Sequence, residues 1–589
     1  MTGAPATTAD ESRGRSTAWG PFAAGALFVV LAILLYGMGL HPAHPTTTLV
    51  RGVRRPGASR RLVVFVKGGS SDMRTYRPLL DRLMAEPELA GSDLLLYDHH
   101  VVRLTTTRAE EIALRLRAEI DAQWIRAGGY DDVVLTGHSM GSLFLRRAYL
   151  LAAGRDPREP MTAPWATSVS RIVLLAGIGR GVDAELHGRW APVLRLGRYV
   201  PLIRESIMYD VLRGSDFVTE VRVGWIRHMA DLARRADSVR PPMVVQVVGT
   251  DDDVLSRGDH IDLLQLPNAY HIDVPGARHR TLHQLELTPD SALAYRLFRE
   301  AFVASVPAHA APRPTFSPAP SHVVFLLHGL RSSRDGWVGD LARRIRQRSP
   351  DADVVESSYG RISMVAFVLP GIRRREIRWL QDQYTEYLAR HPNATFDVVA
   401  HSNGTYLVGE SMARVPSMQF RRVVLLGSVL PTDYAWRERH DLGQVQELRI
   451  DRAADDAISA VLCSAMRGIG MTDVGPSGWR GFDEAGAFET DVGWYAGGHS
   501  AALAAPNLDH LADFVVTGRV AKDSVGLRGA PEPALRWESR LAPWLARAVL
   551  AVLVAIGWML LGGRRGGRAS RVYLAAAALV IAGVVLDVL

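Results

Sequence analysis

The sequence predicts an α/β protein whose sheets are mostly parallel. Short apolar runs of strand length alternate with longer segments in which apolar residues recur at helical spacing. This alternation is typical of a parallel sheet covered by helices. It runs from Arg61 to Val274 and restarts at His322, after a Pro-rich stretch. At 589 residues the chain is too long for one hydrophobic core and long enough for two domains.

Composition excludes several classes of protein. Hydrophobic residues make up 48% of the chain, which excludes intrinsic disorder. The formal net charge is +8, but aromatic and basic residues do not interleave in a stripe, so we expect no nucleic-acid partner. Only Lys67 and Lys522 are lysines, and this preference for arginine is typical of a GC-rich bacterial genome. The single cysteine, Cys463, leaves no intramolecular disulfide, and no motif indicates a metal or a cofactor.

Two segments place a serine at the apex of a sharp turn between a strand and a helix. Gly137-His138-Ser139-Met140-Gly141 follows the apolar run 133–135, and Ala400-His401-Ser402-Asn403-Gly404 follows the run 396–399. Small residues beside the serine let the strand reverse tightly into a helix and leave Oγ exposed. One such motif is weak evidence, because small and polar residues often gather in turns. Two motifs in the same context indicate a repeated catalytic device.

These motifs resemble the nucleophile elbow of the α/β-hydrolase superfamily, to which serine esterases and lipases belong. The resemblance implies two tandem α/β-hydrolase domains, with Ser139 and Ser402 as nucleophiles and no cofactor. It also implies that an acid and then a histidine follow each serine along the chain. The second elbow has Ala400 where glycine is usual, which weakens the match without breaking it.

Candidate partners of Ser139 follow two later strands. The strand 244–248 ends in a turn with three aspartates, from which we choose Asp252 as the acid, with Asp253 as the alternative. The loop 275–282 supplies His279 as the base, because small residues before it suit a side chain brought over the site. The rival histidines are His271 and His283. A solvated acidic turn and a surface histidine are the alternatives without a catalytic role.

The second set is similar but looser. After Ser402, the acid is Asp456, with Asp455 as the alternative, and the base is His499. His510 lies in a segment of helical pattern, where a packing or surface role is more typical. A degenerate, non-catalytic second copy is the alternative to a second active site.

An oxyanion hole needs backbone N–H donors, and the resemblance indicates where they lie. The residue after each serine supplies one donor, which is Met140 in the first domain and Asn403 in the second. The loop after the first core strand supplies the other, from Gly69 and Leu330 respectively. His328-Gly329 matches the family's loop as it commonly appears, whereas Lys67 replaces that histidine in the first domain.

The domain boundaries follow from these segments. We expect an N-terminal tail at 1–20, a first α/β-hydrolase domain at 50–305, a Pro-rich linker at 306–321 and a second α/β-hydrolase domain at 322–520. Residues 181–240 intervene between two core strands, where this family inserts a cap. They mix aromatic and aliphatic residues with arginines, which suits either an ordinary cap or a membrane-contacting lid.

Three apolar segments predict transmembrane helices, at 21–40, 541–562 and 571–589. A cleaved signal peptide is the alternative for the first segment, and a buried helical hairpin is the alternative for the other two. Arginines between the last two segments indicate a cytoplasmic loop and an extracytoplasmic placement of the central domains. Arginines after the first segment favour the opposite orientation. The expected localisation is a multi-pass protein of a bacterial cell membrane, with the lipid bilayer as a partner.

The predicted function is that of a membrane-anchored serine hydrolase. Ser–Asp–His triads and an acyl-enzyme would cleave a carboxylic ester, with a lipid or another hydrophobic acyl ester as the expected substrate. An acyltransferase of the same fold is one alternative. A catalytically inactive membrane scaffold with hydrolase folds is the other.

Overall fold

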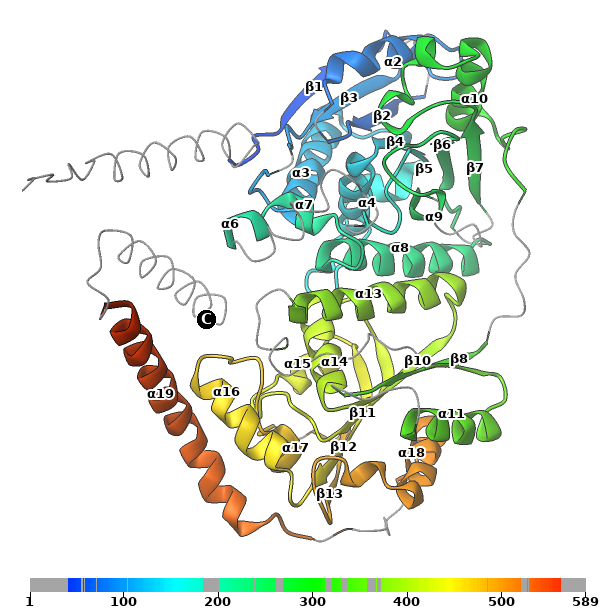
Figure 1. Cartoon of the computed structure of the whole chain (residues 1–589). Coiled ribbons are helices and arrows are strands. Elements are labelled where there is room, and N and C mark those ends of the chain that lie inside the picture. Colours follow the sequence, from blue (N-terminus) through cyan, green and yellow to red (C-terminus); the bar gives the residue numbers. More distant parts are fainter. Residues whose placement is uncertain are drawn as a thin grey trace, which may run out of the picture.

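The computed structural model describes residues 41–562, apart from 54–56, 58, 70, 103, 184–200, 238, 261–267, 313–319, 330–335, 357–366, 368–371, 485, 521–526 and 528. Two sheets lie in this part of the chain (Figure 1). The predicted spans 21–40 and 571–589 fall outside the described residues.

The first sheet has seven strands in the order β1-β3-β2-β4-β5-β6-β7, and only β1 runs antiparallel to its neighbour. Its strands are β1 (Thr46–Val50), β2 (Arg61–Val66), β3 (Asp93–Asp98), β4 (Asp132–His138), β5 (Val169–Leu175), β6 (Met243–Gly249) and β7 (Ala269–Val274). Its helices are α2 (Arg77–Met84), α3 (Ala109–Ala127), α4 (Met140–Ala152), α6 (Pro201–Arg204), α7 (Ile207–Asp210), α8 (Asp216–Arg234), α9 (Arg257–His260) and α10 (Ser291–Val303). Short 3₁₀ turns are η1 (Met73–Tyr76), η2 (Pro164–Ser168), η3 (His279–Thr281) and η4 (Leu285–Leu287).

The second sheet repeats the parallel order of the first. Its six strands lie in the order β13-β12-β11-β10-β8-β9, and every neighbouring pair is parallel. The strands are β8 (His322–Leu327), β9 (Ala352–Val355), β10 (Thr395–His401), β11 (Phe420–Leu426), β12 (Val445–Ala453) and β13 (Glu489–Tyr495). The helices are α11 (Trp337–Arg348), α13 (Ile372–Arg390), α14 (Asn403–Arg414), α15 (Trp436–Asp441), the π-helical η5 (Ile458–Cys463), α16 (Ser464–Gly468), α17 (Ser477–Arg480), the 3₁₀ turn η6 (Ala501–Leu503), α18 (Ala505–Thr517) and α19 (Pro533–Gly562). The prediction of an α/β protein with mostly parallel sheets is confirmed.

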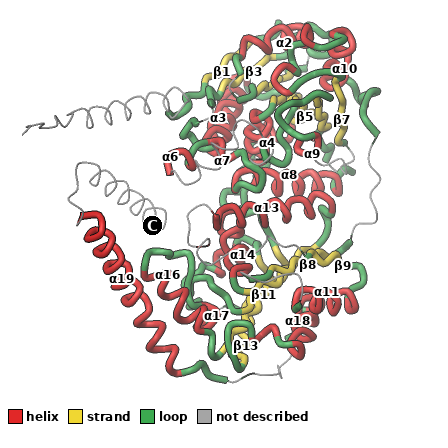
Figure 2. The backbone as a smooth tube through the Cα atoms, in the orientation of Figure 1, coloured by secondary structure: helices red, strands yellow, loops and turns green. Residues whose placement is uncertain are grey.

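The two sheets face each other through α8 and α13, which lie side by side (Figures 1 and 2). The helix α8 packs on α4, and α13 packs on α14, so four helices fill the space between the sheets. One cluster of buried apolar side chains extends without a break from the first sheet through these helices to the second. A second cluster covers the outer face of the first sheet, and a third covers the outer face of the second sheet.

Arginines of the first half bind carboxylates of α13. Arg222 on α8 is 5% exposed, donates to Thr385 Oγ1 at 2.9 Å and pairs with Glu386 at 2.6 Å. Arg180 donates two hydrogen bonds to Asp382, at 2.8 and 2.6 Å. Such paired contacts fix the register of α8 against α13, because each guanidinium must meet its own carboxylate.

The predicted transmembrane helix 541–562 lies within α19, which starts earlier, at Pro533. The first half of α19 carries Arg536, Glu538, Arg540 and Arg547 and packs on α16 and η5. Arg547 donates to the carbonyl of Gly468 at 2.8 Å. Over the described residues, no helix combines the length and the apolar character that crossing a bilayer requires.

The prediction of about three transmembrane helices is therefore wrong for the described part of the chain. The multi-pass cell-membrane localisation, with its extracytoplasmic placement of the central domains, is corrected with it. The error has a physical source, since apolar composition alone does not separate a spanning helix from one that begins with charges and packs on its own chain.

Replacing Arg222 with Met tests whether α8 and α13 hold the two halves together. Arg222→Met should lower the free energy of unfolding by about 2 kcal/mol, because it leaves the partly buried carboxylate of Glu386 without one of its partners. Arg234→Met is the matched control on α8, since Arg234 is exposed and donates to Asn393 at 2.7 Å. The control should change stability by less than about 0.5 kcal/mol in urea denaturation. Equal losses in both variants would contradict the role of Arg222.

Candidate active site

Both serines occupy a strained backbone conformation at a strand-to-helix junction. Ser139 joins β4 to α4 with φ 50° and ψ −122°, and Ser402 joins β10 to α14 with φ 54° and ψ −123°. Residues other than glycine rarely adopt positive φ, and such strain concentrates at functional sites. The two elbows therefore share one geometry, although their sequences differ.

A close backbone approach explains the glycine two positions after each serine. A Cβ on Gly141 would lie 2.2 Å from the carbonyl oxygen of Lys67, and one on Gly404 would lie 2.6 Å from that of Leu327. Each helix therefore begins directly against the neighbouring strand. Two positions before Ser402, Ala400 is fully buried, so the second elbow accommodates a methyl group there.

The structure brings Ser139, His279 and Asp252 into one hydrogen-bonded series. Ser139 Oγ lies 2.7 Å from His279 Nε2, and His279 Nδ1 lies 2.8 Å from Asp252 Oδ2. The backbone amides of Val254 and Leu255 donate to Asp252 Oδ1, each at 2.9 Å. Burial alone would raise the pKa of Asp252, but contacts with His260 and His279 hold that pKa well below its usual range. The carboxylate is thus ionised and can orient the base.

The rival residues of the first set lie elsewhere. Asp253 is exposed, His271 pairs with Asp273 at 2.9 Å, and His283 contacts Thr75 Oγ1 at 2.9 Å. None of these three residues makes a described contact with Ser139 or His279. Of the weighed candidates, Asp252 and His279 alone have the geometry expected of a triad.

The predicted oxyanion donors of the first site are neighbours. A Cβ on Gly69 would meet the Met140 side chain at 3.4 Å. The preceding Gly68 lies against the nucleophile, since its Cβ would be 3.3 Å from Ser139 Cβ. Lys67 is held by Asp98 at 2.8 Å and by the carbonyl of Ser71 at 2.6 Å, so its side chain is fixed in place beside Gly68.

The second set is only partly assembled. His499 Nδ1 lies 2.9 Å from both oxygens of Asp456, which also accepts from the Ser459 amide at 2.8 Å. His499 Nε2, however, is buried without a hydrogen-bond partner among the described residues, so it does not hold Ser402. Asp455 contacts the histidine loop through its backbone amide, and the carbonyl of His510 accepts from Arg449. Leu330 lies outside the described residues.

The histidine before each serine supports the base, a role that the motif alone did not reveal. His138 Nε2 lies 3.0 Å from the carbonyl oxygen of His279, and His401 Nε2 lies 3.3 Å from that of His499. Burial lowers the pKa of His138 well below its ordinary value and lowers that of His401 to about 3. Both rings are therefore neutral, and each one positions the loop that carries the base.

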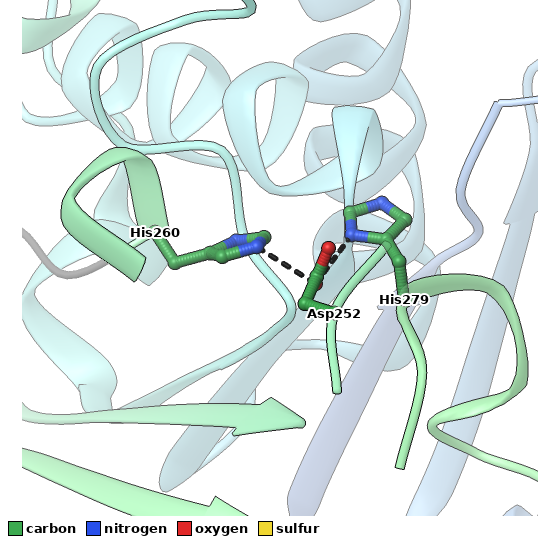
Figure 3. Close-up of side chains that lie close together, drawn as sticks. All are labelled: Asp252, His260 and His279. Carbon is green, nitrogen blue, oxygen red and sulfur yellow. Dashed lines mark hydrogen bonds and ion pairs between the residues drawn. The ribbon is translucent and has the colours of Figure 1, made fainter. Parts of the chain in front are cut away.

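Two further polar residues were not predicted. His260 contacts Asp252 at 2.7 Å from the side opposite His279 (Figure 3). Glu376 of α13 is buried and accepts from Asn403 Nδ2 at 3.2 Å, beside the predicted oxyanion donor of the second site. Both lie in unremarkable sequence, and only the fold brings them to the sites.

Asp252, His260 and His279 also form the one cluster among the described residues with metal-ligand spacing, their ligand atoms lying within 4.8 Å of one another. A zinc ion binds nitrogen and oxygen ligands at about 2.0–2.2 Å and so holds those ligand atoms roughly 3.3 Å apart. Here each histidine touches the carboxylate at hydrogen-bond distance, 2.7 and 2.8 Å. Both contacts of the carboxylate are therefore shorter than the spacing between the ligands of a zinc ion.

Comparisons with known proteins add little. Neither a known family profile nor a curated protein matches the sequence. Similar solved structures include a monoglyceride lipase from Saccharomyces cerevisiae, with 12% identity and a TM-score of 0.30 over 44% of this chain and 90% of that one. They also include the peroxisomal alpha-beta-hydrolase Lpx1 from the same yeast, with 15% identity and a TM-score of 0.28 over 46% of this chain and 93% of that one. At these TM-scores we infer nothing about this chain from them.

The burial of Glu376 predicts that the free energy of unfolding depends on pH. Burial raises the pKa of Glu376 from an ordinary 4.5 to about 7, so between those pH values the folded chain binds a proton that the unfolded chain releases. Its contribution to stability is therefore lost as pH rises from about 4.5 to about 7. Glu376→Gln keeps an acceptor for Asn403 and should remove this loss, so the variant gains stability over the parent across that interval in urea denaturation. If the free energy of unfolding changed with pH by the same amount in the parent and in Glu376→Gln, the raised pKa of Glu376 would be contradicted.

Proposed function

We propose that the chain is a serine hydrolase built from two α/β-hydrolase units, and that it cleaves a carboxylic ester. The observation that carries the proposal is the series Ser139 Oγ, His279 and Asp252 on a strained elbow, with contacts of 2.7 and 2.8 Å. Serine alone is a poor nucleophile, and this series supplies the base and the carboxylate that activate it.

In the proposed reaction, His279 Nε2 takes the proton of Ser139 as Oγ attacks the ester carbonyl. The N–H groups of Met140 and Gly69 stabilise the resulting oxyanion. His279 then protonates the leaving alcohol, and an acyl-enzyme remains on Ser139. Water, deprotonated by the same histidine, attacks this acyl-enzyme and releases the carboxylic acid. Asp252 keeps the imidazole oriented and compensates its charge in both steps.

The second unit is proposed as a slower site with Ser402, Asp456 and His499. Its acid and base are paired, but the base does not contact the serine, so attack requires His499 or Ser402 to move first. A hydrophobic acyl ester stays the proposed substrate class for both units. Rates on p-nitrophenyl esters of short and long acyl chains test that choice.

Labelling with a fluorophosphonate probe tests which serines are nucleophiles. Ser139→Ala should remove most of the labelling of the full chain, and adding Ser402→Ala should remove the slower remainder. Peptide mapping of the labelled parent checks the positions directly. Failure of the parent to label at either serine would overturn the proposal, and labelling of Ser402 alone would move it to the second unit.

Replacing the acid tests the triad in the first unit. Asp252→Asn should lower kcat about 10³–10⁴-fold, because the neutral amide no longer orients and compensates His279. Asp253→Asn is the matched control in the same turn, and it should keep kcat within about twofold, since that side chain is exposed. The kcat of both variants is measured in a Ser402→Ala background, so that the second unit does not contribute to the rate. A full loss in the control with little loss in Asp252→Asn would reverse the assignment.

A further inference from the structure

Tyr76 brings a buried hydroxyl to the residue that precedes the nucleophile of the first site. It is the last residue of η1, in the segment that joins β2 to α2, and its side chain is fully buried. Its ring lies 4.9 Å from that of Phe65 and stacks on that of His283 at 3.8 Å, both measured between centroids. The hydroxyl is 2.7 Å from His138 Nδ1, directly before Ser139 in the chain. Ring packing therefore fixes where the hydroxyl points.

The neighbours of His138 specify which of its nitrogens carries hydrogen. Its Nε2 lies 3.0 Å from the carbonyl oxygen of His279, which can only accept, so Nε2 is the donor. Burial lowers the pKa of His138 well below its ordinary value, so the ring is neutral and its Nδ1 carries no hydrogen. Burial also raises the pKa of Tyr76 to about 12, so the phenol keeps its proton at neutral pH. The Tyr76 hydroxyl therefore donates to His138 Nδ1.

The same hydroxyl holds the loop that carries Gly69. The backbone amide of Gly68 donates to Tyr76 Oη at 3.2 Å. At the other end of the same peptide group, the carbonyl oxygen of Lys67 lies 3.0 Å from His99 Nε2. The peptide between Lys67 and Gly68 is thus held at both of its polar atoms. Because its own N–H is already bound, Gly68 leaves the proposed role of oxyanion donor to Gly69.

The second unit lacks this connection within its described part. Trp337 follows the end of β8 by the same number of positions as Tyr76 follows the end of β2. An indole has no hydroxyl, and the Trp337 ring lies edge-on to that of His401, 6.4 Å between centroids. Among the described residues, His401 Nδ1 and Trp337 Nε1 are both buried without a hydrogen-bond partner. This is also the unit in which the base does not hold its serine.

We propose that Tyr76 is a positioning residue of the first site, whose hydroxyl joins the loop of Gly69 to the loop that carries the base. The proposal rests on the proposed function, in which Gly69 is an oxyanion donor and His279 is the base. A continuous series of hydrogen bonds, of 3.2, 2.7 and 3.0 Å, runs from the Gly68 amide through Tyr76 and His138 to the carbonyl of the base. One side chain thus fixes both groups relative to the nucleophile.

Loss of the hydroxyl should disturb both loops at once. In Tyr76→Phe, the Gly68 amide and His138 Nδ1 lose their common partner. The ring keeps its contacts with Phe65 and His283, so the variant should fold. Buried polar groups without a partner are costly, so both segments should shift toward new partners. The oxyanion donor and the base are then less well aligned with the nucleophile.

The test measures kcat and KM on a p-nitrophenyl ester, per serine titrated by a fluorophosphonate, with the full chain in a Ser402→Ala background. Tyr76→Phe should lower kcat about tenfold or more and change KM by less than about twofold, because the aligned groups act in the transition state. The matched control is Tyr97→Phe, an equally buried tyrosine whose hydroxyl donates to the carbonyl of Ile112 on α3 at 3.2 Å. Its kcat should stay within about twofold of the parent.

A second variant tests whether Tyr76 acts through His138. His138→Gln keeps a side-chain N–H for the carbonyl of His279 and loses the acceptor at Nδ1. Combining it with Tyr76→Phe should lower kcat by less than the product of the two single losses, since both changes remove the same hydrogen bond. A loss equal to that product would contradict a shared series.

An unchanged kcat per titrated serine in Tyr76→Phe, or an equal loss in Tyr97→Phe, would overturn the proposal. Nitrogen-15 NMR of the histidine-labelled full chain provides a readout that needs no activity, with His138→Gln identifying the His138 signals. We expect the proton on Nε2, and an Nδ1 signal that shifts in Tyr76→Phe. A proton on Nδ1 would reject the series. If Ser139 does not label in the parent, the proposed function fails, and the NMR spectrum still decides whether Tyr76 holds His138.

Discussion

The start of the helix after each serine lies so close to the neighbouring strand that no side chain fits between them. Gly141 meets the carbonyl of Lys67, and Gly404 meets that of Leu327. To enter a helix at that point, the chain must reverse within one residue, and the serine takes up the positive φ that this reversal requires. Nucleophile exposure, the donor position of the next amide and the approach of the base all depend on this contact.

The two serine turns have the same backbone geometry, but the side chains around them make different contacts. In the first half, the serine, the base and the acid are already in contact, and the acid is also held by His260. In the second half, the acid and the base are paired, while a buried Glu376 lies beside the residue that follows the serine. The same backbone scaffold thus carries two different distributions of charge.

Local pattern predicted the elements and the triad candidates. The run 244–248 was expected to be a strand and lies within β6, and of the three residues chosen from the first set, His279 lies within hydrogen-bond distance of both Ser139 and Asp252. Chain order and strand ends fix these positions, because parallel strands meet at one edge of the sheet. His260 could not be predicted, since its contact with Asp252 depends on how a short turn folds back. The missing hydrogen bond between Ser402 and His499 depends on how the loop places the His499 ring, which the sequence pattern does not encode.

The transmembrane prediction for 541–562 failed because mean hydropathy is averaged over a segment and takes no account of which residues pack against that segment. In α19, Pro543 lies against Gly468, with a distance of only 2.4 Å between its Cα and the position of a Cβ there. The pairing of α8 with α13 could not be predicted either, because a short stretch of sequence does not show which distant helix carries the complementary charges. Arg222 and Glu386 are ordinary helix residues until the fold brings them together.

The apolar core that passes through α8 and α13 has a consequence for how this protein can be divided. The stretch 306–321 was predicted to be a linker between two domains, but buried side chains from before and after it belong to one cluster. If either half were expressed alone, the apolar face of α8 or α13 that is now buried would be exposed to solvent. The arginines of the first half and the carboxylates of the second would also lose their ion-pair partners. The two halves are therefore expected to fold and unfold as a single cooperative unit, although their sequences can be divided at the Pro-rich stretch.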